Sequence, residues 1–317
     1  MTPSPASLLL EDGARLEKVA SGAQWAEGPL WIPGRRALRY SDIPGDRILE
    51  YSEESGELSV HATGVGFTNG RTLDLDGTVL ECSHGMRALL RDAAESAGGI
   101  REASVVVDRY GDHRLNSPND VIVSSDGTIW FTDPSYGIKR PAEGHPGEEE
   151  YGDRYVFRLD PRTGVLAPVV IDVETPNGLA LSPDESVLYV SDSSLQPCDL
   201  ANPNPARPRG HAIHAYDVVE GRHAKNGRLL VEVDPGLPDG IRVDVDGRLW
   251  SSSASGVQVF SAAGEKLLDI AVPEIVANLA FGGEDGRTLY ITATTSLYRI
   301  RTTTRDAAAA LRSRLED

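Results

Sequence analysis

Short apolar runs separated by tight turns recur along the chain. The clearest example covers residues 175–192, TPNGLALSPDESVLYVSD, where one apolar run follows Asn177, a Pro-Asp turn interrupts it, and a second run returns to Asp192. Apolar runs of this length, bounded by turn residues, are typical of paired β-strands. The pattern predicts a hairpin that opens at a polar residue and returns to an aspartate.

Further copies of this hairpin pattern are found on both sides of it. In four of them a turn Gly lies eight residues after the opening polar residue, as Gly77 follows Asn69. A weaker copy opens at Glu27 and turns at Gly34. We call the opening polar residues the leading residues; they are Glu27, Asn69, Asn119, Asn177, Asp239 and Asn278.

Repeats of this size predict a ring of small sheets. Successive leading residues are roughly 40 to 60 residues apart, which suits about four short strands and their loops, the size of a propeller blade. We therefore predict an all-β fold, a six-bladed β-propeller with four-stranded blades. The alternative is a long β-sandwich with repeated Asp-Gly hairpins, but hairpin turns alone do not require a polar residue at the head of each copy.

The repeat crosses the middle of the chain, so residues 1–317 are predicted to form a single propeller domain with a core at 16–302. We expect segment 16–20 to close the ring by pairing with the last strands near 297–301. Segments 139–154 and 196–210 lack a strand or helix period and are predicted to be loops on the face where the return strands end, either as ordinary solvated insertions or as a rim over a central pocket. The Ala- and Arg-rich tail 306–317 is predicted to be a short surface helix.

The charge of the chain limits its partners. A net charge of −17 and a pI near 4.8 argue against nucleic acid or an anionic membrane, which require clustered Lys and Arg. The two cysteines, Cys82 and Cys198, form no disulfide framework or metal motif. With no signal-peptide pattern in residues 1–13 and no membrane-length apolar stretch, a cytoplasmic location is expected. The oligomeric state stays open.

The leading residues suggest a metal site. The first strand of each propeller blade lies innermost, so equivalent leading residues converge at one end of the central channel. Glu27, Asn119, Asn177 and Asp239 would offer only oxygen ligands there, which suits one divalent cation, Ca²⁺ before Mg²⁺, Mn²⁺ or Zn²⁺. A single Asn would be explained more simply as a turn residue, but four converging residues favour a ligand set.

The return strands should bring further polar side chains to the same mouth. Asp42, His84, Asp133 and Asp192 each lie near the end of a return strand. Buried polar groups need partners, so Asp42 is best interpreted as a blade-to-blade hydrogen-bonding residue. For contact with a polar substrate, the predicted residues are Asn69, His84, Asp133 and Tyr136.

Several motifs together resemble the gluconolactonase branch of the SMP-30/gluconolactonase/LRE-like family. They are Glu27-Gly28-Pro29, Ser117-Pro118-Asn119-Asp120, Phe131-Thr132-Asp133-Pro134, the run from Pro176 to Ser182, the run from Pro238 to Asp244 and the run from Val276 to Gly283. The resemblance implies a six-bladed propeller that hydrolyses lactones and binds a divalent metal, commonly calcium, at the positions of Glu27, Asn119, Asn177 and Asp239. The chain departs from the family pattern at Arg71, Ser83, Ala88 and Ser117, which leaves the substrate open.

The predicted chemistry is metal-assisted hydrolysis of a sugar lactone such as gluconolactone to the aldonic acid. Asp239 is predicted to act as ligand and general base, because a carboxylate can hold a cation with one oxygen and accept a proton with the other. Glu27 is the alternative base. Two other functions remain open: a phosphotriester or fluorophosphate hydrolase on the same metal site, and a non-catalytic sugar- or peptide-binding propeller stapled by the metal.

Overall fold

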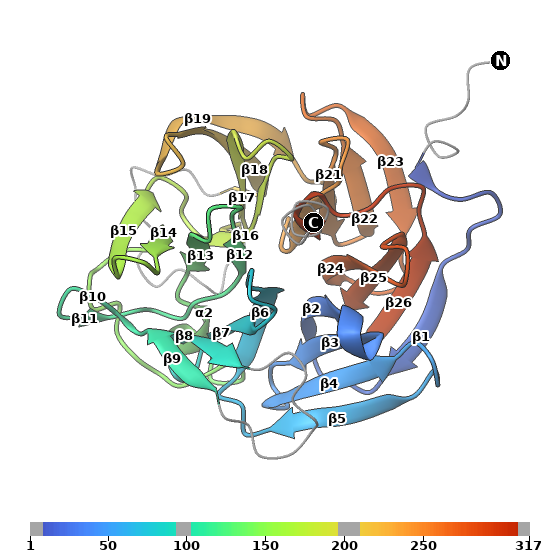
Figure 1. The fold of residues 1–317 in the computed structure, drawn as a ribbon, viewed down its shortest axis with the longest axis horizontal. Helices are drawn as coiled ribbons and strands as arrows, with labels where there is room; N and C mark the ends of the chain where they lie inside the picture. The colour runs from blue at the N-terminus through green and yellow to red at the C-terminus, as the bar shows by residue number, and fades with distance from the viewer. Residues whose placement is uncertain (1–8, 93–102, 196–209, 310–317) are drawn as a thin grey trace.

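In a computed structural model, six four-stranded antiparallel sheets stand in a ring around a central channel (Figure 1). The structure describes residues 9–92, 103–195 and 210–309. The architecture is a six-bladed β-propeller, which confirms the fold predicted from the repeat. In each blade the strand that carries or directly follows the leading residue lies innermost (Figure 1).

The strands follow one another outwards through five of the sheets. Blade 1 holds β2 (Ala26–Ile32), β3 (Ala37–Asp42), β4 (Arg47–Ser52) and β5 (Leu58–Thr63). Blade 2 holds β6 (Thr68–Leu73), β7 (Val79–Ser83), β8 (Ala88–Asp92) and β9 (Ser104–Val107). Blade 3 holds β12 (Val121–Val123), β13 (Ile129–Asp133), β14 (Tyr155–Asp160) and β15 (Val165–Val170). Blade 4 holds β16 (Pro176–Leu181), β17 (Val187–Asp192), β18 (Ala212–Val219) and β19 (His223–Glu232). Blade 5 holds β20 (Ile241–Val243), β21 (Leu249–Ser253), β22 (Gly256–Phe260) and β23 (Lys266–Ala271).

The sixth blade joins the two ends of the chain. It combines β24 (Val276–Gly282), β25 (Thr288–Ala293) and β26 (Ser296–Arg301) with β1 (Glu17–Ser21) as its outer strand. β1 pairs antiparallel with β26, with Lys18 opposite Tyr298. The predicted closing pair is therefore confirmed, and the ring is held shut by main-chain hydrogen bonds.

Few elements lie outside the blades. They are the β10–β11 hairpin (Arg109–Tyr110 and His113–Arg114), the 3-10 turn η1 (Pro33–Arg35) and the short helix α2 (Tyr136–Lys139). Residues 140–154 form neither strand nor helix, as predicted. A helix begins at Ala307, but most of the predicted tail helix, segment 196–209 and Cys198 lie outside the described residues. No helix in the described ranges is long and apolar enough to cross a membrane.

The hydrophobic core lies between the blades. Trp130 of blade 3 packs with Leu179 and Val190 of blade 4, and Trp250 of blade 5 packs edge-on against Phe281 of blade 6 at 5.3 Å between ring centroids. Burying these large side chains between sheets supplies the main stabilisation of the ring. The side chains at the mouth of the channel, by contrast, are largely polar.

Candidate functional site

The leading residues stand at the start of the inner strands, and these strands run in the same sense. Glu27 and Asn177 are the second residues of β2 and β16, whereas Asp239 lies two residues before the start of β20. The pairing register shifts at the leading residues of four blades, between Glu27 and Leu30 in blade 1 and at matching places in blades 2, 4 and 6. A bulge changes the direction in which a side chain points. At these bulges, the leading side chains therefore need not follow the alternating up-and-down directions of a regular β-strand.

The glycines after the leading residues let neighbouring blades meet. Gly178 donates its N–H to the carbonyl of Asp239 at 3.1 Å, and Gly70 donates to the carbonyl of Asn119 at 2.8 Å. A Cβ added to either glycine would overlap the neighbouring main chain. Only glycine permits this approach, so the Asn-Gly motif sets the spacing of the leading residues around the mouth.

Glu27 and Asp239 bring two carboxylates together in the mouth. Oε2 of Glu27 accepts hydrogen bonds from the Gly28 N–H at 2.7 Å and from Nδ2 of Asn278 at 3.1 Å. Burial nevertheless raises the pKa of Glu27 to about 7. The pKa of Asp239 is raised well above its ordinary value by burial and then by the nearby charge of Glu27. Two neighbouring buried acids, both with raised pKa values, form a site that favours protons or a cation.

A third carboxylate lies next to this pair. Asp120 is buried, and its Oδ2 lies 3.6 Å from Nη1 of Arg242. The charge of Asp120 also contributes to raising the pKa of Glu27 and of Asp239. Arg242 is the cation paired with Asp120, and its strand follows directly after Asp239. The sequence pattern did not single out this ion pair.

The amide of Asn177 is held in one orientation. Its Nδ2 donates to Oγ of Ser193 at 3.0 Å and to the Tyr136 hydroxyl at 3.4 Å, and Ser193 in turn donates to the carbonyl of Pro238 at 2.6 Å. Oδ1 of Asn177 is buried and has no hydrogen-bond partner in the described part of the chain. A buried acceptor without a partner is costly, so this oxygen is a candidate ligand atom.

Four leading residues could together hold a metal ion. Glu27, Asn119 and Asn177 are almost completely buried at the mouth, and Asp239 is partly buried. The described residues contain no cluster of three or more His, Cys, Asp or Glu with metal-site geometry. A cation here would therefore depend on amide oxygens as well as carboxylates, a donor set that suits hard divalent ions.

Asn69, His84 and Tyr136 all lie at this end of the channel. Nδ1 of His84 donates to the carbonyl of Glu143 at 3.1 Å, so Nε2 is the acceptor that faces Nδ2 of Asn69 at 3.5 Å. Burial lowers the pKa of His84 to about 4, which keeps the ring neutral. Contact of these three residues with substrate stays a prediction.

The carboxylate of Asp133 is used in hydrogen bonds within the protein. Its carboxylate accepts hydrogen bonds from the N–H groups of Asn116 and Ser117, both at 2.8 Å, and from the Tyr151 hydroxyl at 2.5 Å. The residue is fully buried. This geometry favours a role in holding the segment before Asn119, rather than the substrate contact expected from the sequence.

In two other blades, an aspartate likewise accepts hydrogen bonds from main-chain N–H groups just before the leading residue. Oδ1 of Asp42 accepts hydrogen bonds from the N–H groups of Gln24 and Trp25, at 2.8 and 3.2 Å, and these two residues come just before Glu27 in the chain. Asp192 accepts the N–H of Thr175 at 3.2 Å, ahead of Asn177. In blades 1, 3 and 4, the aspartate that ends the return strand thus fixes the chain just before the leading residue of its own blade. The three aspartates lie 15, 14 and 15 residues after Glu27, Asn119 and Asn177, and this near-constant spacing is visible in the sequence.

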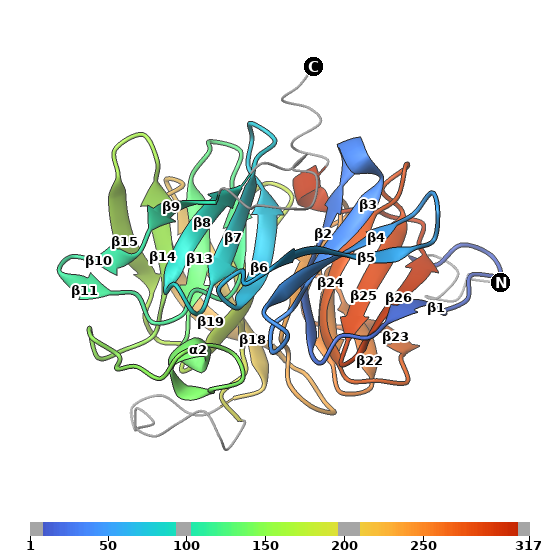
Figure 2. The ribbon, with the colours of Figure 1, turned by 90° about the horizontal axis from the view of Figure 1, so that it is seen from below.

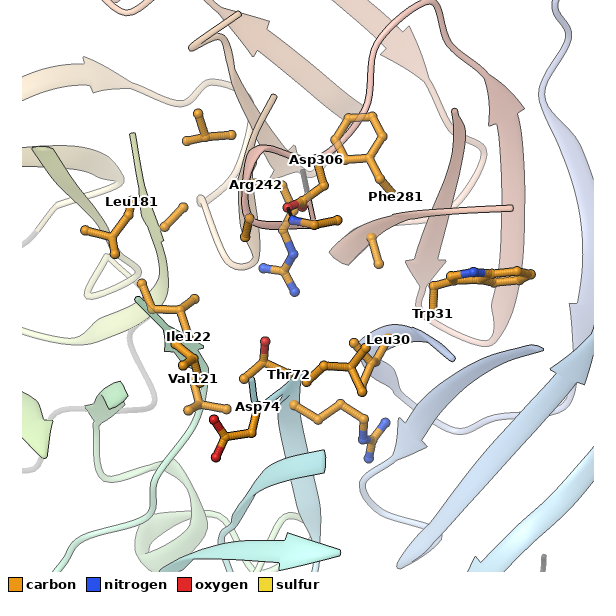
Figure 3. A pocket seen from close by; sticks show the side chains of 18 of the residues that line it. Leu30, Trp31, Thr72, Asp74, Val121, Ile122, Leu181, Arg242, Phe281 and Asp306 are labelled. Atoms are coloured by element: carbon orange, nitrogen blue, oxygen red, sulfur yellow. Dashed lines mark hydrogen bonds between the residues drawn. The ribbon is translucent and has the colours of Figure 1, made fainter. Parts of the chain in front are cut away.

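The other end of the channel has a different character. A cavity of about 280 Å³ is lined mainly by apolar side chains, such as Leu30, Ile122, Leu181 and Phe281, with the guanidinium of Arg242 among them (Figure 3). The start of the C-terminal helix lines it as well. Figure 2 shows the described start of the C-terminal helix (red) and α2 on opposite faces of the ring. None of the leading residues lines this cavity.

Comparison with known proteins shows that the chain is similar to several lactonases. A gluconolactonase from Zymomonas mobilis is 34% identical over 93% of this chain and 83% of its own length. A pentonolactonase from Haloferax volcanii is 29% identical over 86% of this chain and 83% of its own length. The solved structure of a gluconolactonase from Xanthomonas campestris superposes with a TM-score of 0.84 at 37% identity, over 95% of this chain and 94% of that one. Residues 25–295 match the model of the SMP-30/gluconolactonase/LRE-like region, and the chain belongs to that family.

Proposed function

We propose that the protein is a metal-dependent lactonase that opens a sugar lactone, such as gluconolactone, to the aldonic acid. The observation that carries the proposal is the pairing of two mutually repelling carboxylates, Glu27 and Asp239, with the unpartnered Oδ1 of Asn177 at one channel mouth. Relatives named gluconolactonase and pentonolactonase support lactones as the substrate class.

A divalent cation fits the residues present. Glu27 and Asp239 would supply two negative charges, and Asn119 and Asn177 would supply neutral oxygens. A bound cation would offset the repulsion that raises the pKa of Asp239 and would give the buried Oδ1 of Asn177 a partner. All-oxygen coordination favours Ca²⁺, with Mg²⁺, Mn²⁺ and Zn²⁺ as the alternatives.

The protein's own groups can then be given roles. Such a cation, when bound, supplies polarisation of the lactone carbonyl and a more acidic water. Asp239 accepts the proton of the attacking water as its oxygen bonds to the carbonyl carbon. The proton then passes to the ring oxygen as the ring C–O bond breaks, which leaves a hydroxy acid. Glu27 is the less suitable base, because Gly28 and Asn278 already donate to its Oε2.

A titration assay tests the proposal. The purified protein is offered glucono-δ-lactone, a pentonolactone, δ-valerolactone and a phosphotriester at constant pH, with and without chelator, and its metal content is measured. We expect turnover of a sugar lactone that is lost in chelator and restored by Ca²⁺. Turnover of only the phosphotriester, or binding without turnover by the metal-loaded protein, would overturn the proposal.

A further inference from the structure

The segment after β13 builds one wall of the channel mouth. It consists of α2 and the loop 140–154, and it is anchored to blade 2 at several points. Nδ1 of His84 donates to the carbonyl of Glu143 at 3.1 Å, and Nη2 of Arg87 donates to the carbonyl of Glu148 at 3.0 Å. The rings of Phe67 and His145 meet edge to face at 5.3 Å. The wall is therefore a fixed part of the site.

Arg140 and Glu143 form an ion pair on this wall. Nη1 of Arg140 lies 2.9 Å from Oε1 of Glu143, and a turn in which the Glu143 N–H donates to the Arg140 carbonyl at 2.9 Å sets their spacing. The guanidinium also stacks over the Tyr136 ring, 4.7 Å from its centroid. The two side chains keep 26% and 17% of their surface exposed, so solvent or a ligand can reach them.

The ion pair is connected to the leading residues on both sides. The ring under Arg140 carries the Tyr136 hydroxyl, which accepts a hydrogen bond from Nδ2 of Asn177. On the other side, the Glu143 carbonyl holds His84, whose Nε2 faces Asn69. Burial dominates the pKa shifts of Asp239 and His84, and the charge of Arg140 adds a smaller lowering effect to both, which agrees with its place at the mouth.

We propose that Arg140 and Glu143 determine substrate specificity by binding hydroxyl groups of a polyhydroxylated lactone. The inference rests on the proposed lactonase function and deepens it. A guanidinium presents several N–H donors and a carboxylate presents acceptors, so the pair matches neighbouring hydroxyls, each of which donates and accepts. An alkyl lactone would cover the pair without replacing its bonds to water, and it is disfavoured for that reason.

The test compares lactones that differ only in their hydroxyl groups. Arg140→Met removes the donors but keeps a side chain of similar length over Tyr136. We expect kcat/KM for glucono-δ-lactone to fall about 10- to 100-fold, mostly through KM, whereas kcat/KM for δ-valerolactone changes less than about twofold. Glu143→Gln should show the same selectivity, since its main-chain contact to His84 is retained. Arg162→Met, at a side chain that is 67% exposed in the β14–β15 turn, is the matched control and should change neither value.

A binding measurement separates this inference from the proposed function. Calorimetry with gluconolactam and with δ-valerolactam reports recognition without turnover, and Ca²⁺ titration reports whether the cation site is intact. The protein could bind gluconolactam in an Arg140-dependent way and yet hydrolyse no lactone. That result would support the role of Arg140 in binding hydroxyl groups and would overturn the proposed lactonase function. Equal losses of kcat/KM on both lactones, or unchanged values for Arg140→Met in an active protein, would overturn the inference and leave lactone hydrolysis standing.

Discussion

Replacing Asp239 by Asn should stabilise the metal-free protein and inactivate it. The main chain at this position is well supported, since its N–H donates to Oγ of Ser252 at 2.8 Å and its carbonyl accepts from Oγ of Ser191 at 2.8 Å. The substitution therefore changes one oxygen to an amide without disturbing the backbone. It also removes a negative charge that faces Glu27.

The expected size of the effect follows from these surroundings. Burial and the Glu27 charge both disfavour ionised Asp239, so its removal should raise the free energy of unfolding in chelator by about 1–2 kcal/mol near pH 8. For a domain of this size, that corresponds to a rise in Tm of about 1.5–3 °C. The gain should shrink as the pH falls, because native Asp239 then takes up a proton. A lost general base should lower kcat about 10²–10⁴-fold, even at saturating Ca²⁺.

Two measurements on one preparation decide the outcome. Thermal unfolding in chelator gives the stability, and lactone titration at saturating Ca²⁺ gives kcat. Asn119→Asp is the control: it adds a carboxylate to the same site, so it should lower Tm in chelator and tighten Ca²⁺ binding without supplying a new base. Near-normal kcat for the Ca²⁺-saturated Asp239→Asn protein would move the base to Glu27 or to solvent. A lower Tm in chelator would refute the repulsion on which the reasoning rests.

Three further outcomes are expected. In chelator, the free energy of unfolding of the unmodified protein should fall as pH rises from about 4.5 through 7, because folding raises the pKa of Glu27 from 4.5 to about 7; saturating Ca²⁺ should flatten this slope in thermal melts. Asp133→Ala should lower stability in urea by about 2–5 kcal/mol, because it leaves two buried N–H groups without an acceptor, whereas Tyr151→Phe should cost only about 1–2 kcal/mol. Ser193→Ala should weaken Ca²⁺ binding about 10-fold or more in calorimetry, with less than about 1 kcal/mol lost in stability, because it releases the amide of Asn177.

The fold was predictable because its signal is repeated. Each blade carries an opening polar residue, a turn and a return strand, so a weak copy such as that at Glu27 is supported by stronger ones. The closing pair of β1 with β26 followed from the need to join the ends of a ring, and the observed register confirms it. The convergence of the leading residues followed from the same geometry, since inner strands of equivalent blades start at the same end.

The surroundings of the leading residues were less predictable. Arg140 and Glu143 lie in a run of Pro, Gly and Glu without periodicity, and only the fold shows that this run returns to the mouth. Asp133 was expected at the substrate because it lies at the right end of its strand. The sequence cannot show that its carboxylate is used by two N–H groups and a tyrosine hydroxyl, since Tyr151 comes from a distant loop position.

The balance of charge at the mouth argues for a divalent ion in particular. Six charged side chains lie at or next to the mouth, and four of them form two ion pairs that are each neutral: Arg242 with Asp120, and Arg140 with Glu143. Within the described residues, Glu27 and Asp239 form no ion pair, and Glu27 accepts hydrogen bonds only from the N–H groups of Gly28 and Asn278. Two uncompensated negative charges match one divalent cation, whereas a monovalent ion would leave one carboxylate buried and repelled. The ion pairs on either side therefore set the charge that the central site can accept.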